Sequence, residues 1–366
     1  MISCLFKEKL GSKYSEEGLY SLASYQHLDI PHNLKQILVS SANNSLAKKT
    51  WSAYKTAQNN LCKFAEETGC QVDLPLSEGK ILAFSAWLLN RGTTAATIET
   101  YISGLRSAHL IAGEAPPQLR TPLVTAVIQG KKNSENLVKR SGASSTRLPI
   151  TPSLLRLMKL ELAQLDMKNQ DKKMLWAAAT VAFSAGLRGG EYLCKEKHYF
   201  DPTTMLREKD ISLDTLNIEG TNTQIIKIKL KAEKQNKGAT ASIIDVYPSH
   251  NSICPVRAFA KFLDSKPLFY PDMPAFRFQD GTNLTQEKFN KILKIIFKTH
   301  LTDINGTIST HSFRIGLAST LGELGFSDDQ VMQAGRWSSR AFQAYLKLPR
   351  TRRLEMAKAI GNMATS

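Results

Sequence analysis

Two arginines and a histidine lie at predicted helix ends, with the spacing that holding a phosphate group would need. His311 and Arg314 are three residues apart at a helix start, which puts both side chains on one face. Arg188 ends an apolar helix, and Glu191, three residues later, can orient it or pair with it. An arginine fork matches two phosphate oxygens, and a histidine can donate or shuttle a proton. Each pair alone is more typical of a surface ion pair or of a cation at a helix C-terminus.

A second group of candidate residues follows near the end of the chain. The segment Gly335-Arg336-Trp337-Ser338-Ser339 precedes an amphipathic stretch that contains Tyr345. The sequence has no P-loop, Rossmann glycine fingerprint, H-E-x-x-H motif or nucleophile elbow, and no Asp/Glu cluster suited to two Mg²⁺ ions. If the protein acts on a phosphodiester, we therefore expect no metal: its own cations would stabilise the transition state, and a side chain would be the nucleophile.

The composition favours a polyanionic partner. The 366-residue chain has 48 Lys and Arg against 32 Asp and Glu, a net charge of +16, and nucleic acid is the usual partner of such an excess. The five cysteines are scattered and never spaced C-x-x-C, which argues for a reducing compartment and against a zinc site. The longest uncharged run, residues 174–187, is shorter than the ~18–20 residues of a membrane helix. We expect a soluble intracellular protein, without a signal peptide and without a membrane partner.

The first part of the chain predicts a small helical domain between two irregular segments. Residues 1–43 show no sustained hydrophobic period and are expected to form a loosely ordered N-terminal extension. Residues 44–132 carry four helical patterns that begin at polar caps and end at glycines or polar turns. Residues 133–149 are polar, with Ser-Gly and Pro, and read as an interdomain linker.

Residues 150–366 form a second predicted domain of mixed composition. Two helices open it, at 152–165 and 171–187, and three short β-like runs follow at 210–213, 225–230 and 242–246. The last two runs flank a hairpin turn at 231–240. Helices are then expected to the end of the chain, roughly at 254–263, 285–299, 310–324, 327–334, 340–346 and 352–360. The prediction is a mainly α protein with one small antiparallel sheet.

The three groups of residues together are far more specific than any one of them. Arg188 with R-x-x-E, H-x-x-R more than a hundred residues later, then G-R-W-S-S and a tyrosine resemble the tyrosine recombinase (phage integrase) family. The stretch 311–345 resembles eukaryotic mobile-element recombinases of the crypton, DIRS and Ngaro type. The resemblance covers about residues 44–360. It implies a four-helix, SAM-like core-binding domain followed by a mixed α/β catalytic domain with a small antiparallel sheet.

The resemblance also implies a role for each candidate residue. Tyr345 would attack the scissile phosphorus and leave a 3′-phosphotyrosyl bond. Arg188 and Arg314 would hold the non-bridging oxygens. His311 would assist proton transfer, and Glu191 would position these residues without contacting the phosphate itself.

The family's catalytic lysine lies in a β-hairpin, and this hairpin offers three lysines. They are Lys231, Lys234 and Lys237. Residues 233–236 best match the S-K-T-D turn of the family, which favours Lys234, with Lys231 as the alternative.

One position departs from the family pattern. Most members place a His or Trp donor nine residues before the tyrosine and directly after a glycine. Here that position is Arg336, and Trp337 is eight residues before Tyr345. Both side chains can donate to a phosphate oxygen, and Trp337 is alternatively a core-packing residue.

The predicted partner is duplex DNA. The basic residues in or beside the linker, Lys131, Lys132, Lys139 and Arg140, are candidate DNA contacts, with a nuclear-import patch or solvated charge as alternatives. The resemblance further implies a homo-tetramer on two DNA sites, a C-terminal segment packed on a neighbouring subunit, a nuclear location, and a reaction without ATP, metal or other cofactor.

The resulting hypothesis is a site-specific recombinase or integrase that mobilises a transposable element. A type IB topoisomerase shares this catalytic logic and would relax DNA without exchanging strands. A domesticated descendant would bind DNA without cutting it, although an intact Arg188, His311, Arg314 and Tyr345 argues against drift. A helical protein-interaction module would bind its partner with little sensitivity to salt.

Overall fold

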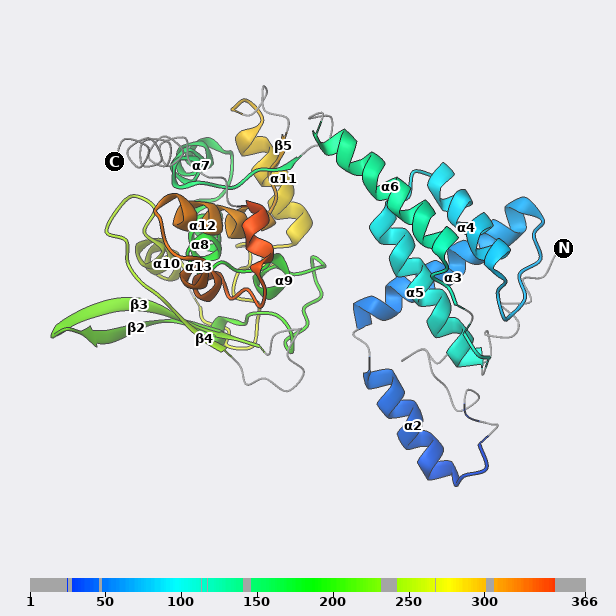
Figure 1. Cartoon of the computed structure of the whole chain (residues 1–366). Helices are drawn as coiled ribbons and strands as arrows, with labels where there is room; N and C mark the ends of the chain where they lie inside the picture. Colours follow the sequence, from blue (N-terminus) through cyan, green and yellow to red (C-terminus); the bar gives the residue numbers. More distant parts are fainter. Residues whose placement is uncertain are drawn as a thin grey trace, which may run out of the picture. The chain divides into compact units, whose positions relative to one another are not determined.

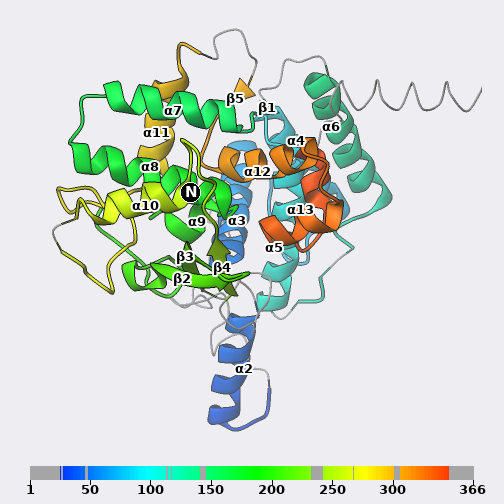
Figure 2. The same ribbon diagram turned by 90° about the vertical axis from the view of Figure 1, so that its left-hand side faces the viewer.

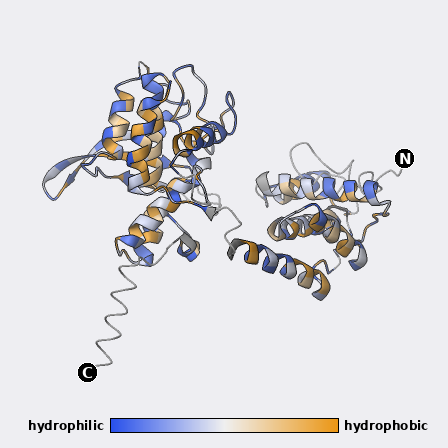
Figure 3. Cartoon of the chain, turned by 90° about the horizontal axis from the view of Figure 1, so that it is seen from above, coloured by the Kyte–Doolittle hydropathy of each residue, from blue (hydrophilic) through white to orange (hydrophobic). Residues whose placement is uncertain are grey.

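The computed structural model describes residues 25, 28–45, 48–112, 114–116, 118–140, 146–231, 242–266, 268–300 and 306–345. Contacts divide the chain into two compact units, residues 1–144 and 145–366 (Figure 1). In each unit, hydrophobic residues gather where the helices pack on one another (Figure 3). No helix among the described residues is long and apolar enough to cross a membrane.

The first unit is helical. Its described helices are α2 (His32–Asn44), α3 (Lys48–Thr68), α4 (Glu78–Asn90), α5 (Ala95–Ala112) and α6 (Pro122–Arg140). Helices α3 to α6 share one apolar core, whereas α2 has no buried residue. His109 is fully buried in this core and both ring nitrogens have partners: Nε2 accepts from the Leu76 amide at 3.0 Å, and Nδ1 lies 2.7 Å from the Leu105 carbonyl. It is a satisfied core histidine.

Two segments predicted to be irregular contain helix. Residues 133–140, the first part of the predicted linker, continue α6, and α2 lies inside the predicted extension. No Gly or Pro interrupts 133–140, and the Glu135 carboxylate accepts the Ala95 amide at 3.0 Å, at the N-terminus of α5. This tertiary contact favours helix where composition alone suggested a linker.

The second unit surrounds a buried helix. Helix α8 (Asn169–Ser184) contacts α7 (Pro152–Gln164), α10 (Pro255–Leu263) and α12 (His311–Glu323), and every residue from Ala177 to Phe183 is buried. Its alanines allow neighbouring helices to approach closely. The remaining elements are α9 (Gly189–Tyr192), η2 (Glu208–Asp210), α11 (Gln286–Phe297), α13 (Asp328–Gly335) and η3 (Arg340–Tyr345).

The predicted antiparallel sheet is confirmed. It has the order β2-β3-β4, with β2 (Ile211–Ile218), β3 (Thr221–Leu230) and β4 (Ser242–Val246). The β2–β3 hairpin extends away from the helices (Figure 1). Its strands are longer than the predicted runs at 210–213 and 225–230, and Glu219 and Gly220, with φ of 48° and 82°, form the tight two-residue turn that joins them.

A two-stranded parallel sheet was not predicted. β1 (Thr146–Arg147) pairs with β5 (Gly306–Thr307), and the two strands lie beside one another near α12 (Figure 2). The end of the predicted linker is therefore a strand that belongs to the second unit. Residues 352–360, predicted to be helical, lie outside the described residues.

Candidate active site

Arg314 is the most deeply placed candidate. It lies in the first turn of α12 and is only 2% exposed. Its guanidinium donates to the Gly186 carbonyl and, at 3.3 Å, to the Arg336 carbonyl. It also lies 4.3 Å from the centre of the Trp337 ring, within cation–π distance. These contacts hold the guanidinium in one orientation.

Arg188 and Glu191 pair as the R-x-x-E spacing predicted. Arg188 is the N-cap residue of α9, and its Nη1 donates to Glu191 Oε1 at 2.9 Å. The Arg188 amide donates to Oε2 of the same carboxylate at 2.7 Å, so Glu191 contacts both the main chain and the side chain of the N-cap residue. The Arg188 side chain is 37% exposed, so it is oriented by Glu191 and still open to solvent.

Arg336 joins Arg188 and Arg314 through its main chain. Arg336 is the C-cap of α13 with φ of 55°, the left-handed region. Its carbonyl accepts from Arg314, and from Arg188 Nη2 at 3.4 Å. The Arg336 guanidinium donates to Glu191 Oε2 at 3.1 Å and to the Gly186 carbonyl at 3.3 Å. The guanidiniums of all three arginines are therefore linked through a small set of shared acceptors. These acceptors are the Gly186 and Arg336 carbonyls and the Glu191 carboxylate.

Gly186 gives this cluster its shape. It follows α8 with φ of 56°, and a Cβ there would come within 2.9 Å of Leu317 Cδ2 and 3.3 Å of Gly335 Cα. A glycine is required because both the conformation and the close approach exclude a side chain. The chain can then turn so that the Gly186 carbonyl accepts from two arginines.

His311 begins α12 beside the arginines and is half-buried. Burial lowers its pKa first, and the positive charges of Arg147, Arg314 and Arg188 lower the pKa further. The imidazole is therefore neutral at neutral pH and able to accept a proton.

The structure separates the two candidates for the third donor position. The Trp337 ring packs on Phe342, with centroids 5.6 Å apart, and covers Gly335, where a Cβ would lie 1.5 Å from the ring. The ring is partly buried beside Ala318, Val331 and Phe342, so Trp337 has a packing role. Its role as a phosphate donor stays a prediction. Arg336, by contrast, lies against Glu191 within the cluster.

The segment that carries Tyr345 packs on the same helices. η3 ends at Tyr345, and Phe342 in its middle is fully buried with Ala318 of α12 and Val331 of α13. The Tyr345 side chain lies outside what the structure describes. η3 is thus anchored to the helices that carry Arg314 and Arg336.

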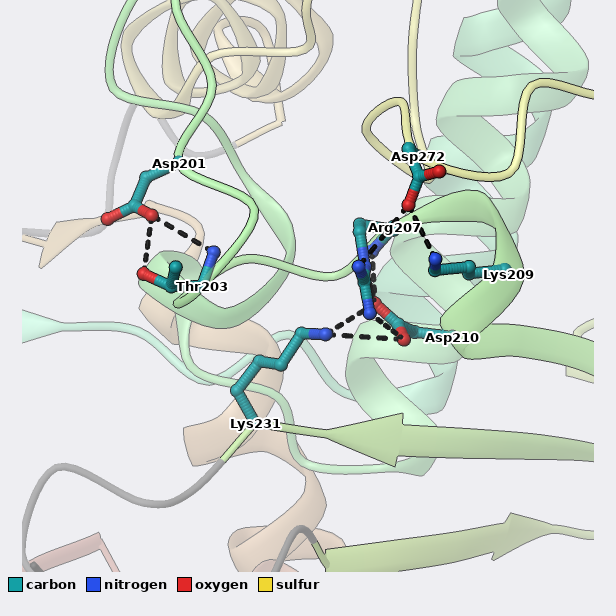
Figure 4. A network of polar contacts seen from close by, with 7 residues as sticks. All are labelled: Asp201, Thr203, Arg207, Lys209, Asp210, Lys231 and Asp272. Atoms are coloured by element: carbon teal, nitrogen blue, oxygen red, sulfur yellow. Dashed lines mark hydrogen bonds and ion pairs between the residues drawn. The ribbon is translucent and has the colours of Figure 1, made fainter.

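Of the hairpin lysines, only Lys231 is described. Figure 4 shows its Nζ beside Asp210, at 3.1 Å from Oδ2. Asp210 also accepts from the Arg207 side chain at 2.8 Å and from its amide at 3.0 Å. These bonds from Arg207 and Lys231 hold the pKa of Asp210 below its usual range although burial opposes this. Lys231 is therefore engaged in an ion pair, and Lys234 and Lys237 lie outside the described residues.

The predicted linker cations lie on α6. Lys132 pairs with Glu99 of α5 at 2.8 Å, so a carboxylate already offsets its charge. Lys131 is half-buried on the same helix, and the side chains of Lys139 and Arg140 lie outside the described residues. These cations belong to the first unit and the arginine cluster to the second.

Sequence reasoning missed Arg147 of β1, whose charge acts on His311. No local signal marks it, since it lies in a polar segment that looked like a linker. Within the described ranges, no group of three or more His, Cys, Asp or Glu side chains is arranged to hold a metal ion.

Comparisons with known proteins identify the fold. No family model and no curated protein matches the chain. Among solved structures, the XerH site-specific recombinase bound to a palindromic difH substrate is 14% identical with a TM-score of 0.55, over 98% of this chain and 93% of that one. The Tn1549 transposon integrase in complex with transposon right end DNA is also 14% identical, with a TM-score of 0.53, over 89% and 98%. The chain has the tyrosine recombinase fold. At this identity the similarity establishes the fold alone.

Proposed function

We propose that the protein is a site-specific DNA recombinase that cuts and rejoins duplex DNA through a 3′-phosphotyrosyl intermediate. One observation carries the proposal: the guanidiniums of Arg188, Arg314 and Arg336 gather at one place, where Arg188 and Arg336 contact the Glu191 carboxylate and Arg314 donates to the Gly186 and Arg336 carbonyls. Two donor nitrogens of Arg336, Nε and Nη1, are buried and have no partner among the described residues. Leaving such donors unpaired costs about 1–3 kcal/mol each. A bound anion with several oxygens would satisfy them, and a phosphodiester has that geometry.

The chemistry follows from the placement of the cations. Tyr345 Oη forms a bond to the scissile phosphorus, and the bond from phosphorus to the 5′ oxygen breaks. The tyrosine proton passes to neutral His311, and Lys234 supplies a proton to the departing 5′ oxygen. Arg188, Arg314 and the Arg336 donors stabilise the negative charge that grows on the non-bridging oxygens. A 5′-hydroxyl from another strand reverses these steps and releases the enzyme.

The finer assignments belong to the same proposal. The 311–345 motif supports a relative of the crypton, DIRS and Ngaro recombinases, which move transposable elements, act in the nucleus and work as tetramers on two DNA sites. The XerH and Tn1549 proteins of the same fold were solved with DNA. That supports duplex DNA as the partner here.

A strand-exchange assay tests the proposed function. Two duplexes of different length and label, each carrying the terminal sequences of the DNA element that encodes the chain, are incubated with the protein. A recombinase yields products that join the two labels. Relaxation of supercoiled plasmid without joined products would instead indicate a topoisomerase. Binding with neither product would indicate a DNA-binding protein without catalysis.

A further inference from the structure

The chain is held against the candidate active site over residues 146–150. Arg147 pairs with Thr307 in the β1–β5 sheet, and the Leu148 amide donates to the Thr307 carbonyl at 2.9 Å. Three residues after Arg147, the Ile150 amide donates to the Ser312 carbonyl at 2.9 Å, in the first turn of α12. The segment therefore runs alongside 307–312 and is fastened at both ends.

Close packing fixes which face of β1 is turned outward. The Leu148 side chain covers Gly306, where a Cβ would lie 2.4 Å from Leu148 Cγ, and Leu148 packs on the core of the second unit. A Cβ on Gly316 of α12 would lie 2.0 Å from the Ile150 carbonyl oxygen. Because side chains alternate along a strand, Arg147 is directed away from the core, and it is exposed.

Arg147 differs from the other arginines at the site. In the part of the chain that the structure describes, its guanidinium has no hydrogen bond and no ion pair, whereas the guanidiniums of Arg188 and Arg336 both contact Glu191. Its charge nevertheless acts on His311, as do the charges of Arg314 on the same helix and Arg188 before α9. An exposed, unpaired guanidinium therefore lies at the rim of a site built from cations.

We propose that Arg147 is a further phosphate-binding residue, which contacts the backbone phosphate next to the scissile one on the strand that is cut. This inference rests on the proposed function. Main-chain hydrogen bonds fix the backbone that carries Arg147 next to the start of α12 before DNA arrives, so only the side chain has to be ordered on contact. An adjacent phosphate lies within the reach of an arginine whose neighbours hold the scissile phosphate. Arg147 also helps to keep His311 neutral as a proton acceptor.

Binding and cleavage of variants test the inference. Arg147→Ala should weaken duplex binding and lower the slope of log affinity against log salt by about one, the expected loss of one phosphate contact. Arg147→Lys should retain most of the affinity. The matched control is Arg156→Ala on α7, which removes the same charge from another exposed arginine of this unit. The inference predicts that the control leaves the salt slope near that of the wild type.

Neutral methylphosphonates, placed one at a time around the scissile position, locate the contact. At one phosphate next to the scissile one, the methylphosphonate should weaken DNA binding by the wild-type protein. The loss should equal the loss that Arg147→Ala causes on unmodified DNA. The Arg147→Ala variant should lose nothing further at that position, because both changes remove the same contact. Independent, additive losses at every phosphate would overturn the inference.

The pH profile gives a readout that a purely structural role would not change. Removing the Arg147 charge raises the pKa of His311, so the acidic limb of adduct formation should move to higher pH in Arg147→Ala and stay in place in Arg147→Lys. An unchanged limb in Arg147→Ala would contradict the inference. If the wild type forms no covalent adduct at all, the proposed function fails. If the wild type forms the adduct and Arg147→Ala behaves like Arg156→Ala, only the role of Arg147 fails.

Discussion

At the scale of single residues, the candidate site depends on a main-chain carbonyl as much as on side chains. The Arg336 carbonyl accepts from both Arg188 and Arg314, and this requires a left-handed backbone at Arg336. For a residue with a Cβ, that conformation costs roughly 1–2 kcal/mol. The two buried Arg336 donors without a described partner add to the cost. Such strain is consistent with a site whose ligand supplies the missing partners.

Arg336→Gly separates the carbonyl from the guanidinium. Glycine tolerates the left-handed conformation, so the carbonyl should stay in place and thermal stability should be unchanged or higher. Loss of the donor should slow adduct formation by ~10²-fold, the usual effect of removing one transition-state donor. Single-turnover cleavage of a nicked duplex measures the rate. If the variant forms the adduct as fast as the wild type, the Arg336 guanidinium does not take part in the reaction.

The buried His109 predicts that the stability of the protein depends on pH. Burial lowers its pKa below the ordinary 6.5, while hydrogen bonding to Leu105 and the charge of Glu114 only partly oppose this. Below pH 6.5, His109 is protonated in the unfolded chain but stays neutral in the folded protein until the pH is lower. Stability should therefore fall as pH falls, by up to ~1.4 kcal/mol per pH unit for this group. His311 contributes in the same direction because its pKa is lowered too.

Urea unfolding of the full chain between pH 8 and pH 5 checks this expectation. His109→Gln should be less stable at pH 8, since a buried hydrogen bond is altered, and should lose less stability on acidification. His300→Gln is the control, because His300 is partly exposed and pairs with Glu161 at 2.9 Å. Equal pH slopes in the wild type and His109→Gln would refute the assignment.

Residue spacing predicted part of the site and could not predict the rest. The R-x-x-E spacing predicted the Arg188–Glu191 contact, which the structure shows, although Arg188 is the N-cap of α9 and not the end of the preceding apolar helix. Counting back from Tyr345 left both Arg336 and Trp337 as candidate donors, and only the structure shows that Arg336 contacts Glu191. Arg147 reaches the site through a strand pairing with residues far along the chain, which no local pattern contains.

At the scale of elements, β1 and the start of α12 hold the site together. Gly316 allows α12 to contact the Ile150 backbone, where a Cβ would overlap the carbonyl oxygen at 2.0 Å. The partner in this contact is main chain, so it cannot rotate away. The helix and the segment that carries Arg147 are therefore coupled through a residue without a side chain.

Gly316→Ala should destabilise the protein by ~3 kcal/mol or more, within the range of severe steric mechanisms. It should also reduce cleavage, since the segment that carries Arg147 must move. Gly130→Ala on α6 is the matched control, because a Cβ there meets nothing within 4 Å. The control should be neutral or slightly stabilising, owing to the better helix propensity of alanine. Chemical unfolding measures both variants, and a Gly316→Ala protein as stable as the wild type would contradict the packing.

The elements predicted from sequence were those with strong local patterns. The antiparallel sheet and the helices that flank it have clear periods, and the structure confirms them. The first part of the predicted linker, 133–140, is helical, and Glu135 makes a tertiary contact with Ala95 that composition does not reveal. The β1–β5 pair was missed for the same reason: two-residue strands have no period to detect.

At the scale of the whole molecule, the charge balance indicates how the protein would act. The chain carries +16, and its second unit holds a cation cluster around one carboxylate. In the proposed reaction, these cations would take the role that metal ions have in many phosphoryl-transfer enzymes. The electrostatic stabilisation of the reaction would then come from the protein alone.

Cleavage should therefore continue in excess EDTA. Adduct formation on a nicked duplex is measured with EDTA and with added Mg²⁺, at matched ionic strength so that counterion effects are constant. Equal rates are expected. Loss of activity that Mg²⁺ restores, but that an equivalent amount of monovalent salt does not, would show that a metal takes part in the chemistry.

The identity of the covalent link tests the central claim most directly. The protein is incubated with a nicked suicide duplex that carries the terminal sequences of its encoding element, and the adduct is digested with trypsin and sequenced by mass spectrometry. The account predicts a nucleotide joined through its 3′ phosphate to Tyr345, in the peptide 341–347. Tyr345→Phe, which lacks only the attacking oxygen, should bind the duplex as tightly and form no adduct. An adduct on any other residue, or one that persists in Tyr345→Phe, would contradict the account.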